Sequence, residues 1–418
     1  MSFDIALSGI QAINEQLTTV SNNIANAGTF GFKSSRANFS SIYAGSRPTG
    51  VEVGSLTQSI GLNGGVLNTG RGLDASINGR GFFVSRDAQN TLTYSRVGIF
   101  SASSDGYLVT PSGNKVQGYG VVTGSAALGA LGDIKVPTGQ IPAVATTRVE
   151  YVGNMSSDWA PKAGPFNKAD GLTYNSTKVS LLYDSLGAKH TLNQYFVKSP
   201  LPAVNTVDVH YTIDDIDSPT VTTLVFDTNG QLKTVGGVPA TNAPVPPATA
   251  PAGYKPIFPP IALTQTVPGA DPLKFNLSFN GSTQFAGEAV TTTNSANGYA
   301  SGSFTGVELA DDGSVVAKYT NGEKQSVGTV ALGTFPDEGS LTPIDDTSWI
   351  ASTTSGTPLY DRPGTGMAGR LNTSSLEQSN VDITSELVGL MTSQRNYQAN
   401  SKVISTESAM MQSLMQAL

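Results

Sequence analysis

The sequence has 418 residues and a net charge of −7, and charged residues make up only 13% of it, about half the share that is typical of globular proteins. The acidic balance disfavours nucleic acid and anionic membrane surfaces as partners. The absence of cysteine excludes thiol catalysis, disulfides and cysteine-bound metals. The 46 glycines and 23 prolines favour strands joined by many turns over a helical enzyme.

The N-terminus predicts an amphipathic helix over residues 2–27, which ends at Gly28 and Gly31. Its apolar residues follow alternating steps of three and four, which keeps a narrow seam along one side of a helix. The residues of this N-terminal seam are Phe3, Ala6, Ile10, Ile13, Leu17, Val20, Ile24 and Ala27. The first residues lack the basic leader of a secretory signal, so we expect that any export proceeds without a cleaved signal peptide.

Residues 33–71 are rich in serine, threonine and glycine and show little periodicity, so we expect extended or irregular chain there. A second stretch, residues 352–375, is rich in proline, glycine and serine and precedes the C-terminal helix. Together the two stretches form a predicted connecting region between the terminal helices and the centre of the chain. No run approaches the ~20 apolar residues of a membrane span, so no membrane insertion is expected.

The centre of the chain predicts short strands joined by tight turns. Six Asn-Gly and three Asp-Gly pairs, which are strong hairpin signals, all lie between the two terminal regions. We expect an inner β domain over residues 72–149 and 291–351 and an outer β domain over residues 150–290. In the outer domain, residues 207–213 and 273–279 alternate apolar and polar side chains, as half-buried antiparallel strands do.

The C-terminus repeats the helical spacing from about residue 382 to 418. The residues of this C-terminal seam are Ile383, Leu387, Leu390, Gln394, Tyr397, Ser401, Ile404, Ser408, Met411, Met415 and Leu418. Because each helix offers a seam that the other can fill, we expect segments 1–32 and 376–418 to pair. The predicted fold is mainly β with α-helical coiled-coil termini. It has several nested, discontinuous domains, since the chain must run out and back between its paired ends.

The sequence predicts no catalytic, cofactor-binding or metal site. The two histidines, His190 and His210, have no second histidine or glutamate at ligand spacing, and no Gly-x-Ser-x-Gly elbow accompanies them. Residues 364–369 match Gly-x-Gly-x-x-Gly by letter. However, Pro358 and Pro363 stand where a dinucleotide site needs a strand, so a flexible linker is the better interpretation. We therefore expect a protein that is not an enzyme and has no cofactor.

The two seams have two possible uses, either to cover a core within the monomer or to pack against helices of other subunits. A helix that covers a β domain usually shows a wider apolar stripe. The C-terminal seam is narrow and is interrupted by Gln394, Ser401 and Ser408. Polar positions of this kind can set the register among several like helices, which favours self-assembly.

Several segments resemble the bacterial flagellar rod and hook proteins, and within that family the hook proteins. The matching segments are residues 21–33, 77–84, 94–119, 376–382 and 391–400. The terminal motif residues that we single out are Asn22, Asn23, Asn26, Gly31, Phe32, Lys33, Gln394, Arg395, Asn396, Tyr397 and Asn400. The resemblance covers about half of the chain, because residues 150–290 carry no signature that we can place.

The resemblance implies a structural subunit that polymerises with copies of itself into a curved helical tube. Such a tube acts as a universal joint that transmits torque from rod to filament. The large apolar residues of the two seams would then be the assembly residues. The implied partners are the distal rod protein, the hook cap protein, the hook–filament junction protein and the flagellar type III export apparatus. The implied location is the extracellular hook.

Two other functions stay open at this stage. A distal rod protein would share the terminal motifs, although rod proteins are much shorter and lack the central insertion. A β-rich adhesin with a coiled-coil stalk would explain the strands in the centre. It would not explain why both ends carry heptads together with the quoted motifs.

Overall fold

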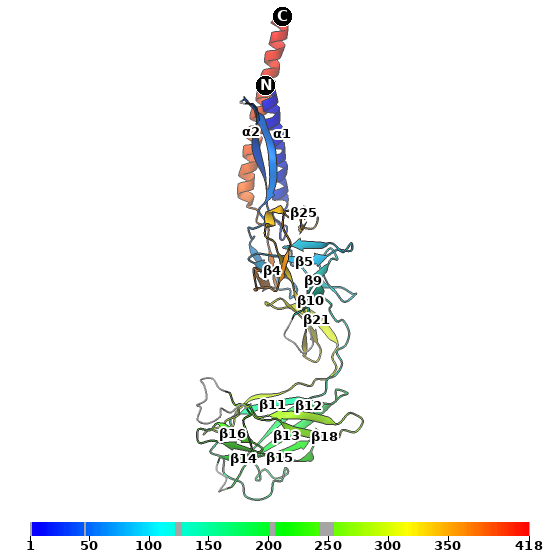
Figure 1. The fold of residues 1–418 in the computed structure, drawn as a ribbon, viewed down its shortest axis with the longest axis vertical. Coiled ribbons are helices and arrows are strands. Elements are labelled where there is room, and N and C mark those ends of the chain that lie inside the picture. The colour runs from blue at the N-terminus through cyan, green and yellow to red at the C-terminus, as the bar shows by residue number, and fades with distance from the viewer. Residues whose placement is uncertain (1, 46, 122–127, 201–204, 242–254, 418) are drawn as a thin grey trace. The chain divides into compact units, whose positions relative to one another are not determined.

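The computed structural model describes residues 2–45, 47–121, 128–200, 205–241 and 255–417 of the chain (Figure 1). Most regular structure is strand, and one long helix lies at each end of the sequence. The described residues form two compact units. Unit 1 comprises Met1–Thr138, Thr305–Lys318 and Lys324–Leu418, and unit 2 comprises Gly139–Phe304 and Tyr319–Glu323. The predicted fold class, mainly β with paired terminal helices, is confirmed.

The terminal helices α1 (Ser2–Ala25) and α2 (Ile383–Ala417) pack side by side in unit 1. Asp382 caps the start of α2, because its carboxylate accepts hydrogen bonds from the Thr384 N–H at 3.0 Å and the Ser385 hydroxyl at 2.7 Å. The helices are antiparallel, since the N-terminal half of α1 faces the C-terminal half of α2. The predicted pairing of the two ends is therefore present.

A long hairpin follows α1 and packs along it. Its strands are β1 (Ser35–Ala44) and β2 (Arg47–Gln58), and the Val51 N–H donates to the Ser8 hydroxyl of α1 at 3.2 Å. The expectation was extended or irregular chain; this stretch is extended, and the irregular alternative was wrong. Bulges break the register at Asn38/Phe39 and again between Ile42 and Tyr43, and much of both faces is exposed. Without one buried face, the sequence lacks the period of two that marks a strand.

The largest sheet belongs mainly to unit 1 and joins thirteen strands of the described chain. Eight strands follow one path, in the order β21 (Phe304–Leu309), β22 (Ser314–Tyr319), β23 (Lys324–Val330), β9 (Lys115–Val121), β5 (Phe82–Arg86), β6 (Leu92–Ser95), β26 (Ser348–Ile350) and β25 (Thr342–Ile344). The branching strands are β7 (Ser101–Ala102), β8 (Leu108–Val109), β10 (Leu128–Asp133), β24 (Leu332–Thr334) and β27 (Leu359–Asp361). A short 3-10 helix spans Glu338–Ser340. Phe82, Tyr94, Phe335 and Trp349 are the large aromatic side chains of the core.

Two small antiparallel pairs bring the incoming and outgoing chain together below the helices. Strand β3 (Val66–Asn68) pairs with β29 (Ser375–Glu377), and β4 (Ala75–Asn78) pairs with β28 (Arg370–Thr373). The expected flexible linker at residues 364–369 was also wrong. It is a tight turn between β27 and β28, closed by a 2.8 Å hydrogen bond from the Gly364 N–H to the Gly369 carbonyl.

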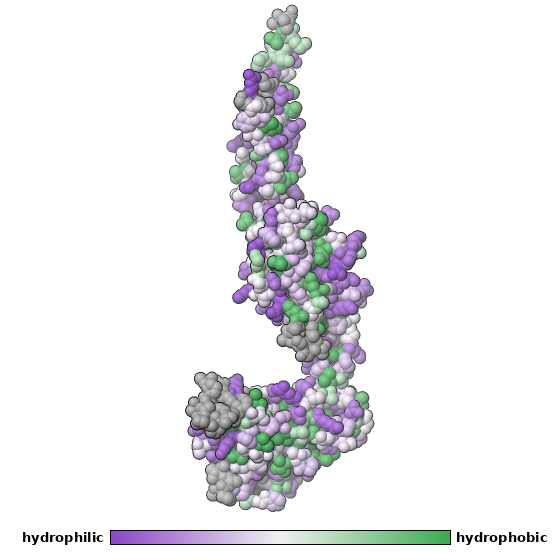
Figure 2. Space-filling model, viewed as in Figure 1, coloured by the Kyte–Doolittle hydropathy of each residue, from purple (hydrophilic) through white to green (hydrophobic). Residues whose placement is uncertain are grey.

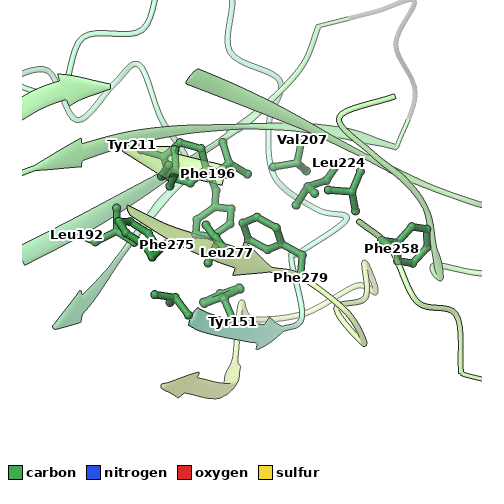
Figure 3. Close-up of a cluster of buried hydrophobic side chains, with 14 of the residues drawn as sticks. Tyr151, Leu192, Phe196, Val207, Tyr211, Leu224, Phe258, Phe275, Leu277 and Phe279 are labelled. Atoms are coloured by element: carbon green, nitrogen blue, oxygen red, sulfur yellow. The ribbon is translucent and has the colours of Figure 1, made fainter. Parts of the chain in front are cut away.

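Unit 2 contains two sheets whose apolar faces share one core (Figure 3). One sheet has the order β18 (Ile261–Gln265), β19 (Leu273–Ser278), β11 (Arg148–Gly153) and β20 (Thr291–Ala296). The other has the order β12 (Ser176–Tyr183), β13 (Lys189–Lys198), β14 (Thr206–Ile213), β15 (Ile216–Phe226), β16 (Leu232–Val235) and β17 (Val238–Pro239). The predicted alternation in residues 207–213 and 273–279 is confirmed, because every second side chain is buried in this core.

Among the described residues, neither terminal helix combines the length and the apolar character that a membrane-spanning helix requires.

Candidate functional site

The side of α2 that faces α1 is mostly small and polar. The α2 residues with buried or half-buried side chains are Glu386, Gly389, Leu390, Ser393, Asn400, Ser401, Ile404 and Glu407. Gly9 lets the helices approach closely near one end of the contact, and Gly389 faces α1 near the other end. A Cβ on Gly9 would lie 3.0 Å from Asn400 Nδ2, and one on Gly389 would lie 3.9 Å from Val20 Cγ2. The helix pair therefore uses little of the apolar surface that α2 carries.

The α1 face is more apolar than its partner. Ala6, Ile13 and Val20 are buried, and the other described seam positions from Ile10 to Ala27 are half-buried. Phe3, near the free end of α1, is 43% exposed. The N-terminal seam thus lies largely in contacts within the subunit.

On α2 the predicted seam is only partly covered. Leu390, Ser401 and Ile404 lie in the α1 contact, and Tyr397 lies at its border. Leu418 lies outside the described residues. The large apolar side chains that stay between 44% and 76% exposed are Ile383, Leu387, Val388, Met391, Val403, Met410, Met411, Leu414 and Met415. Figure 2 shows apolar side chains on the surface of this helical part. We call these nine residues the exposed α2 surface.

The last part of α2 extends beyond α1 (Figure 1). The antiparallel pairing joins Asn23 to Glu386 and Gly9 to Asn400, so Ser2 falls opposite Glu407. We call residues 408–417 the overhang. Met411 follows Ile404 at heptad spacing and Met415 comes four residues later, so the side of α2 that faces α1 continues into the overhang.

The asparagines of the N-terminal motif fix the end of α1. Asn23 is 1% exposed; its Nδ2 donates to the Ser35 carbonyl and to Glu386 Oε1 of α2, both at 2.8 Å. The Ser35 N–H returns a 2.9 Å bond to Asn23 Oδ1. Asn26, which directly follows α1, bonds back to Asn22 in the last turn of the helix. One buried amide therefore joins α1, the hairpin and α2.

A buried ionic cluster lies in unit 1 where three distant segments meet. Lys33 Nζ lies 2.6 Å from Glu377 Oε1, and Arg96 Nη1 lies 3.4 Å from Glu377 Oε2. All three side chains are only 1–2% exposed. Burial lowers the pKa of Lys33, against the opposing hydrogen bond from Glu377. Burial also lowers the pKa of Arg96, and the charge of Glu377 opposes that shift.

Backbone groups complete this cluster. Lys33 donates to the Leu62 carbonyl at 2.6 Å, Arg96 Nη2 donates to the Gly79 carbonyl at 3.0 Å, and the Gly64 N–H donates to Glu377 Oε1 at 3.1 Å. Since a buried charge is costly without partners, the two cations and the one carboxylate depend on each other and on these groups.

Gly31 and Asn380 join the chain after α1 to the chain before α2, next to the cluster. Gly31 has φ +68°, and a Cβ there would lie 2.9 Å from Val97 Cγ2. Its N–H donates to the Glu377 carbonyl at 2.8 Å. Asn380 Oδ1 accepts from the Ser34 N–H at 2.7 Å, and the Asn380 N–H donates to the half-buried Phe32's carbonyl at 3.3 Å. We call the contacts of Asn23, Gly31, Lys33, Arg96, Glu377 and Asn380 the junction.

The motif residues of α2 lie apart from the junction. Gln394, Arg395 and Asn396 are exposed. Asn396 and Asn400 line a groove of about 400 Å³ between the helices and the hairpin, together with residues such as Ile13 and Phe39. Sequence reasoning missed the roles of Arg96 and Glu377. The available signal was that Arg96 directly follows β6 and Glu377 ends β29, each within a segment of a recognised motif.

The described residues hold no group of three or more His, Asp or Glu side chains arranged to bind a metal ion. His190 sits between two carboxylates, Asp184 and Asp214, and each ring nitrogen contacts one of them. The ring of His210 stacks on Phe166 at 4.3 Å between centroids. Both histidines are thus engaged in contacts within unit 2.

Four family models match the chain. They are described as flagella basal body rod protein over residues 3–33, flagellar hook protein FlgE/F/G D1 domain over 76–156, flagellar basal body protein FlaE D2 domain over 154–299, and flagellar basal body rod FlgEFG protein C-terminal over 372–417. The third match covers the region in which sequence reasoning found no signature.

Curated relatives match along the whole chain. The flagellar hook protein FlgE of Escherichia coli (strain K12) is 36% identical over 427 residues, which cover 99% of both chains. The chain belongs to the flagellar hook protein FlgE family. FlgE of Salmonella typhimurium (strain LT2) is 35% identical over the same coverage. The crystal structure of FlgE2 from Helicobacter pylori covers 75% of this chain and 100% of its own, at 14% identity and a TM-score of 0.51, and so supports the fold alone.

Membership of the FlgE family makes the chain a structural subunit of the flagellar hook that polymerises in the flagellar axis. The location expected from the resemblance, the flagellar hook, is confirmed. The distal rod protein and the adhesin are not favoured, because full-length relatives are hook proteins.

Proposed function

We propose that the exposed α2 surface is the main assembly surface of this hook subunit. The observation that carries the proposal is that α1 packs on the small, polar side of α2 and leaves nine large apolar side chains of α2 at the surface. Large apolar side chains that stay exposed in groups mark a site of protein–protein interaction. In a helical homopolymer, the natural partner is a different surface of the helical region in a second copy.

The overhang supports a head-to-tail direction for this assembly. Met411 and Met415 continue the side of α2 that α1 covers, but they lie past the end of α1 in their own subunit. A helix from a second copy would complete the seam there. Contacts between different surfaces of successive copies do not close on themselves and therefore build an open helical tube.

The junction gives the tube a route for torque. Asn23, Lys33, Glu377 and Asn380 fasten both terminal helices to the β part of unit 1 through buried hydrogen bonds and ion pairs. Buried, hydrogen-bonded polar groups favour one arrangement over others. We propose that this junction keeps the helix pair fixed while the outer contacts between subunits slide as the hook bends. The four-part domain division predicted from the sequence is retained as part of this proposal.

The finer partners and the route to the hook are also proposals. The resemblance to hook proteins supports contacts with the distal rod protein, the hook cap protein and the hook–filament junction protein. It also supports export through the flagellar type III apparatus without a cleaved signal peptide, to an extracellular location. No enzymatic activity is part of the proposal.

The test is electron microscopy of full-length subunits under polymerising conditions. The test variant combines Leu387→Ser, Val388→Ser and Met391→Ser on the exposed α2 surface. The control combines Gln398→Ser, Lys402→Ser and Gln412→Ser, which are equally numerous and also exposed on α2. Wild type and control should form tubes, and the test variant should stay as single subunits with unchanged helix content.

Tubes of normal length from the apolar-to-serine variant would contradict the proposed surface. If the control also forms no tubes, assembly is sensitive to any substitution on the surface of α2. That result would equally contradict a specific role of the apolar residues in assembly. Circular dichroism of each variant shows whether α2 is still folded, so that misfolding is not mistaken for loss of assembly.

A further inference from the structure

The methionines of this chain are concentrated on the proposed assembly surface. Met391, Met410, Met411 and Met415 lie on α2 and are 54–76% exposed. Two others provide contrasts within the same chain. Met367 is 54% exposed on the turn between β27 and β28, and Met155 is 1% exposed in the core of unit 2. Met1 lies outside the described residues.

Thioether sulfur is open to a defined chemical modification by peroxides. A sulfur lone pair attacks one peroxide oxygen, the S–O bond forms as the O–O bond breaks, and water leaves after a proton transfer. The sulfur is oxidised to the sulfoxide and the peroxide is reduced. The product is polar and chiral, so a flexible apolar side chain becomes one that needs hydrogen-bond partners.

We propose that Met391, Met410, Met411 and Met415 form an oxidation site of the free subunit, and that their sulfoxides prevent its assembly. The proposal rests on the proposed function, because it takes the exposed α2 surface to be the assembly surface. In the free subunit the four sulfur atoms are within reach of a peroxide. In the polymer they are covered, and a sulfoxide buried there without partners carries the cost of an unsatisfied polar group.

The positions of the four residues determine how each acts. Met411 and Met415 lie on the overhang, where a second copy would have to pack directly against them. Met391 lies on another side of the helix, next to Val388 and Leu387 in the exposed α2 surface. Oxidation of the four side chains therefore places sulfoxides both on the overhang and on the surface around Met391. Oxidation of Met367 places a sulfoxide only on the turn between β27 and β28.

A partition experiment tests the proposal on the natural chain. Free subunits are treated with dilute hydrogen peroxide until each exposed methionine is partly oxidised, the peroxide is removed, and polymerisation is started. Polymer and unassembled subunits are then separated by sedimentation, and peptide mass spectrometry gives the sulfoxide fraction at each methionine. We expect sulfoxides of the four α2 residues to be enriched roughly tenfold in the unassembled fraction, as follows from the cost of a buried polar group. Met367 sulfoxide should divide evenly, and Met155 should stay reduced.

Even partitioning of the α2 sulfoxides between polymer and free subunits would overturn the proposal. A variant with leucine at all four α2 positions gives a second measurement, since leucine is apolar and has no sulfur. It should polymerise after full peroxide treatment, whereas wild type and Met367→Leu should not. If the leucine variant polymerises when untreated but not after peroxide treatment, the damage lies at other residues. That result would also overturn the proposal.

The proposed function can fail separately. If untreated wild type forms no polymer, the assembly role of the chain fails, and the oxidation proposal falls with it. If untreated wild type polymerises and fully oxidised wild type polymerises equally well, assembly stands and only the oxidation site is lost.

Discussion

The core of unit 2 and the surface of α2 use apolar side chains in opposite ways. In strands β14 and β19, every second residue is buried between two sheets, and Val209 and Leu277 have no exposed surface. On α2, side chains such as Val388 and Met415 are more than half exposed, although the helix contacts α1 along most of its length. Unit 2 therefore buries its apolar side chains within the subunit. The apolar side chains of α2 stay exposed, where a second subunit can contact them.

The junction adds a third arrangement, in which charge replaces apolar packing. Lys33, Arg96 and Glu377 are as buried as the residues of an apolar core, but they depend on exact pairing. An apolar core tolerates small losses of contact, whereas a buried ion left without its partner is strongly destabilising. The comparison therefore predicts different sensitivities for the three regions.

The largest effect is expected from Glu377→Gln, which leaves Lys33 and Arg96 buried without their carboxylate. The free energy of unfolding of unit 1 should fall by about 3–5 kcal/mol, the usual result of removing one member of a buried ion pair. Denaturant unfolding, followed by Trp349 fluorescence in a Trp159→Phe background, measures it, because Trp349 lies in the core of unit 1.

The matched control for the junction is Glu308→Gln, which removes a carboxylate that pairs with Lys318 and Lys324 nearer the surface. That change should cost at most about 1 kcal/mol. Equal unfolding midpoints for the two variants would show that the buried cluster contributes no more than a surface pair.

The second effect, Leu277→Ala, removes a side chain from the centre of the unit 2 core. We expect a loss of about 2–5 kcal/mol, since the substitution leaves a cavity among packed neighbours. Fluorescence of Trp159, which packs against this core, follows the transition. Leu172→Ala, at a position 78% exposed, should leave the transition within about 0.5 kcal/mol of wild type. A comparable loss in both variants would contradict the assigned core.

The third effect concerns the backbone at Gly31. Alanine there would have to adopt φ +68° and place its Cβ 2.9 Å from Val97 Cγ2, so unit 1 should lose about 1–3 kcal/mol. Gly28→Ala is the control, because a Cβ at Gly28 meets no atom within 4 Å. Thermal unfolding of the two variants is followed by Trp349 fluorescence. Equal unfolding temperatures for Gly31→Ala and Gly28→Ala would contradict the close approach at Gly31.

A smaller effect should depend on pH. His190 can donate to both Asp184 and Asp214 only as an imidazolium. Burial opposes that charge, but hydrogen bonds to Asp214 and Asp184 outweigh it and raise the pKa of His190. A raised pKa means that the stabilisation is full below the unfolded value of about 6.5 and disappears as pH rises through the folded value.

The variant His190→Gln should therefore be less stable than wild type at pH 6, and the difference should shrink as the pH rises. In His210, burial lowers the pKa, against the opposing charge of Asp208. His210 thus destabilises unit 2 as pH falls, so His210→Gln should show the reverse trend. Unfolding curves across the pH range, followed by Trp159 fluorescence, measure both, and parallel trends would contradict the assignment.

The smallest effect on the free subunit is expected from Val388→Ser on the exposed α2 surface. Its free energy of unfolding should stay within about 0.5 kcal/mol of wild type, because a side chain that is 61% exposed loses little buried surface. Its yield of sedimentable polymer should nevertheless fall, unlike that of Gln398→Ser. A large loss of monomer stability would show that Val388 belongs to a contact within the subunit.

The sequence predicts those features that depend on local periodicity. Residues 207–213 alternate because one face of β14 is buried, and the steps of three and four in α1 follow the side that packs on α2. The sequence did not predict the hairpin at Ser35–Gln58. Its bulges and its exposed faces remove the alternation of apolar and polar residues that marks a strand. The linker interpretation of residues 364–369 failed because tight turns and linkers share the same glycines and prolines.

The site required information that no local pattern contains. The apolar steps on α2 suggested a seam with α1, whereas only part of that seam, which includes Leu390 and Ile404, lies in the contact with α1. Periodicity shows that a helix has a face, but it does not show which molecule covers it. Likewise, residues 33, 96 and 377 are far apart in the chain, so their pairing appears only once the strands bring them together.

The most direct test of the central claim is hydrogen–deuterium exchange of α2 in the free subunit and in the polymer. If a second copy packs on the exposed α2 surface and the overhang in the polymer, the amides of residues 408–417 should exchange rapidly in the free subunit and slowly in the polymer. Strand β14 should be protected equally in both. Equally rapid exchange of the overhang in subunit and polymer would contradict the claim that a second copy covers it.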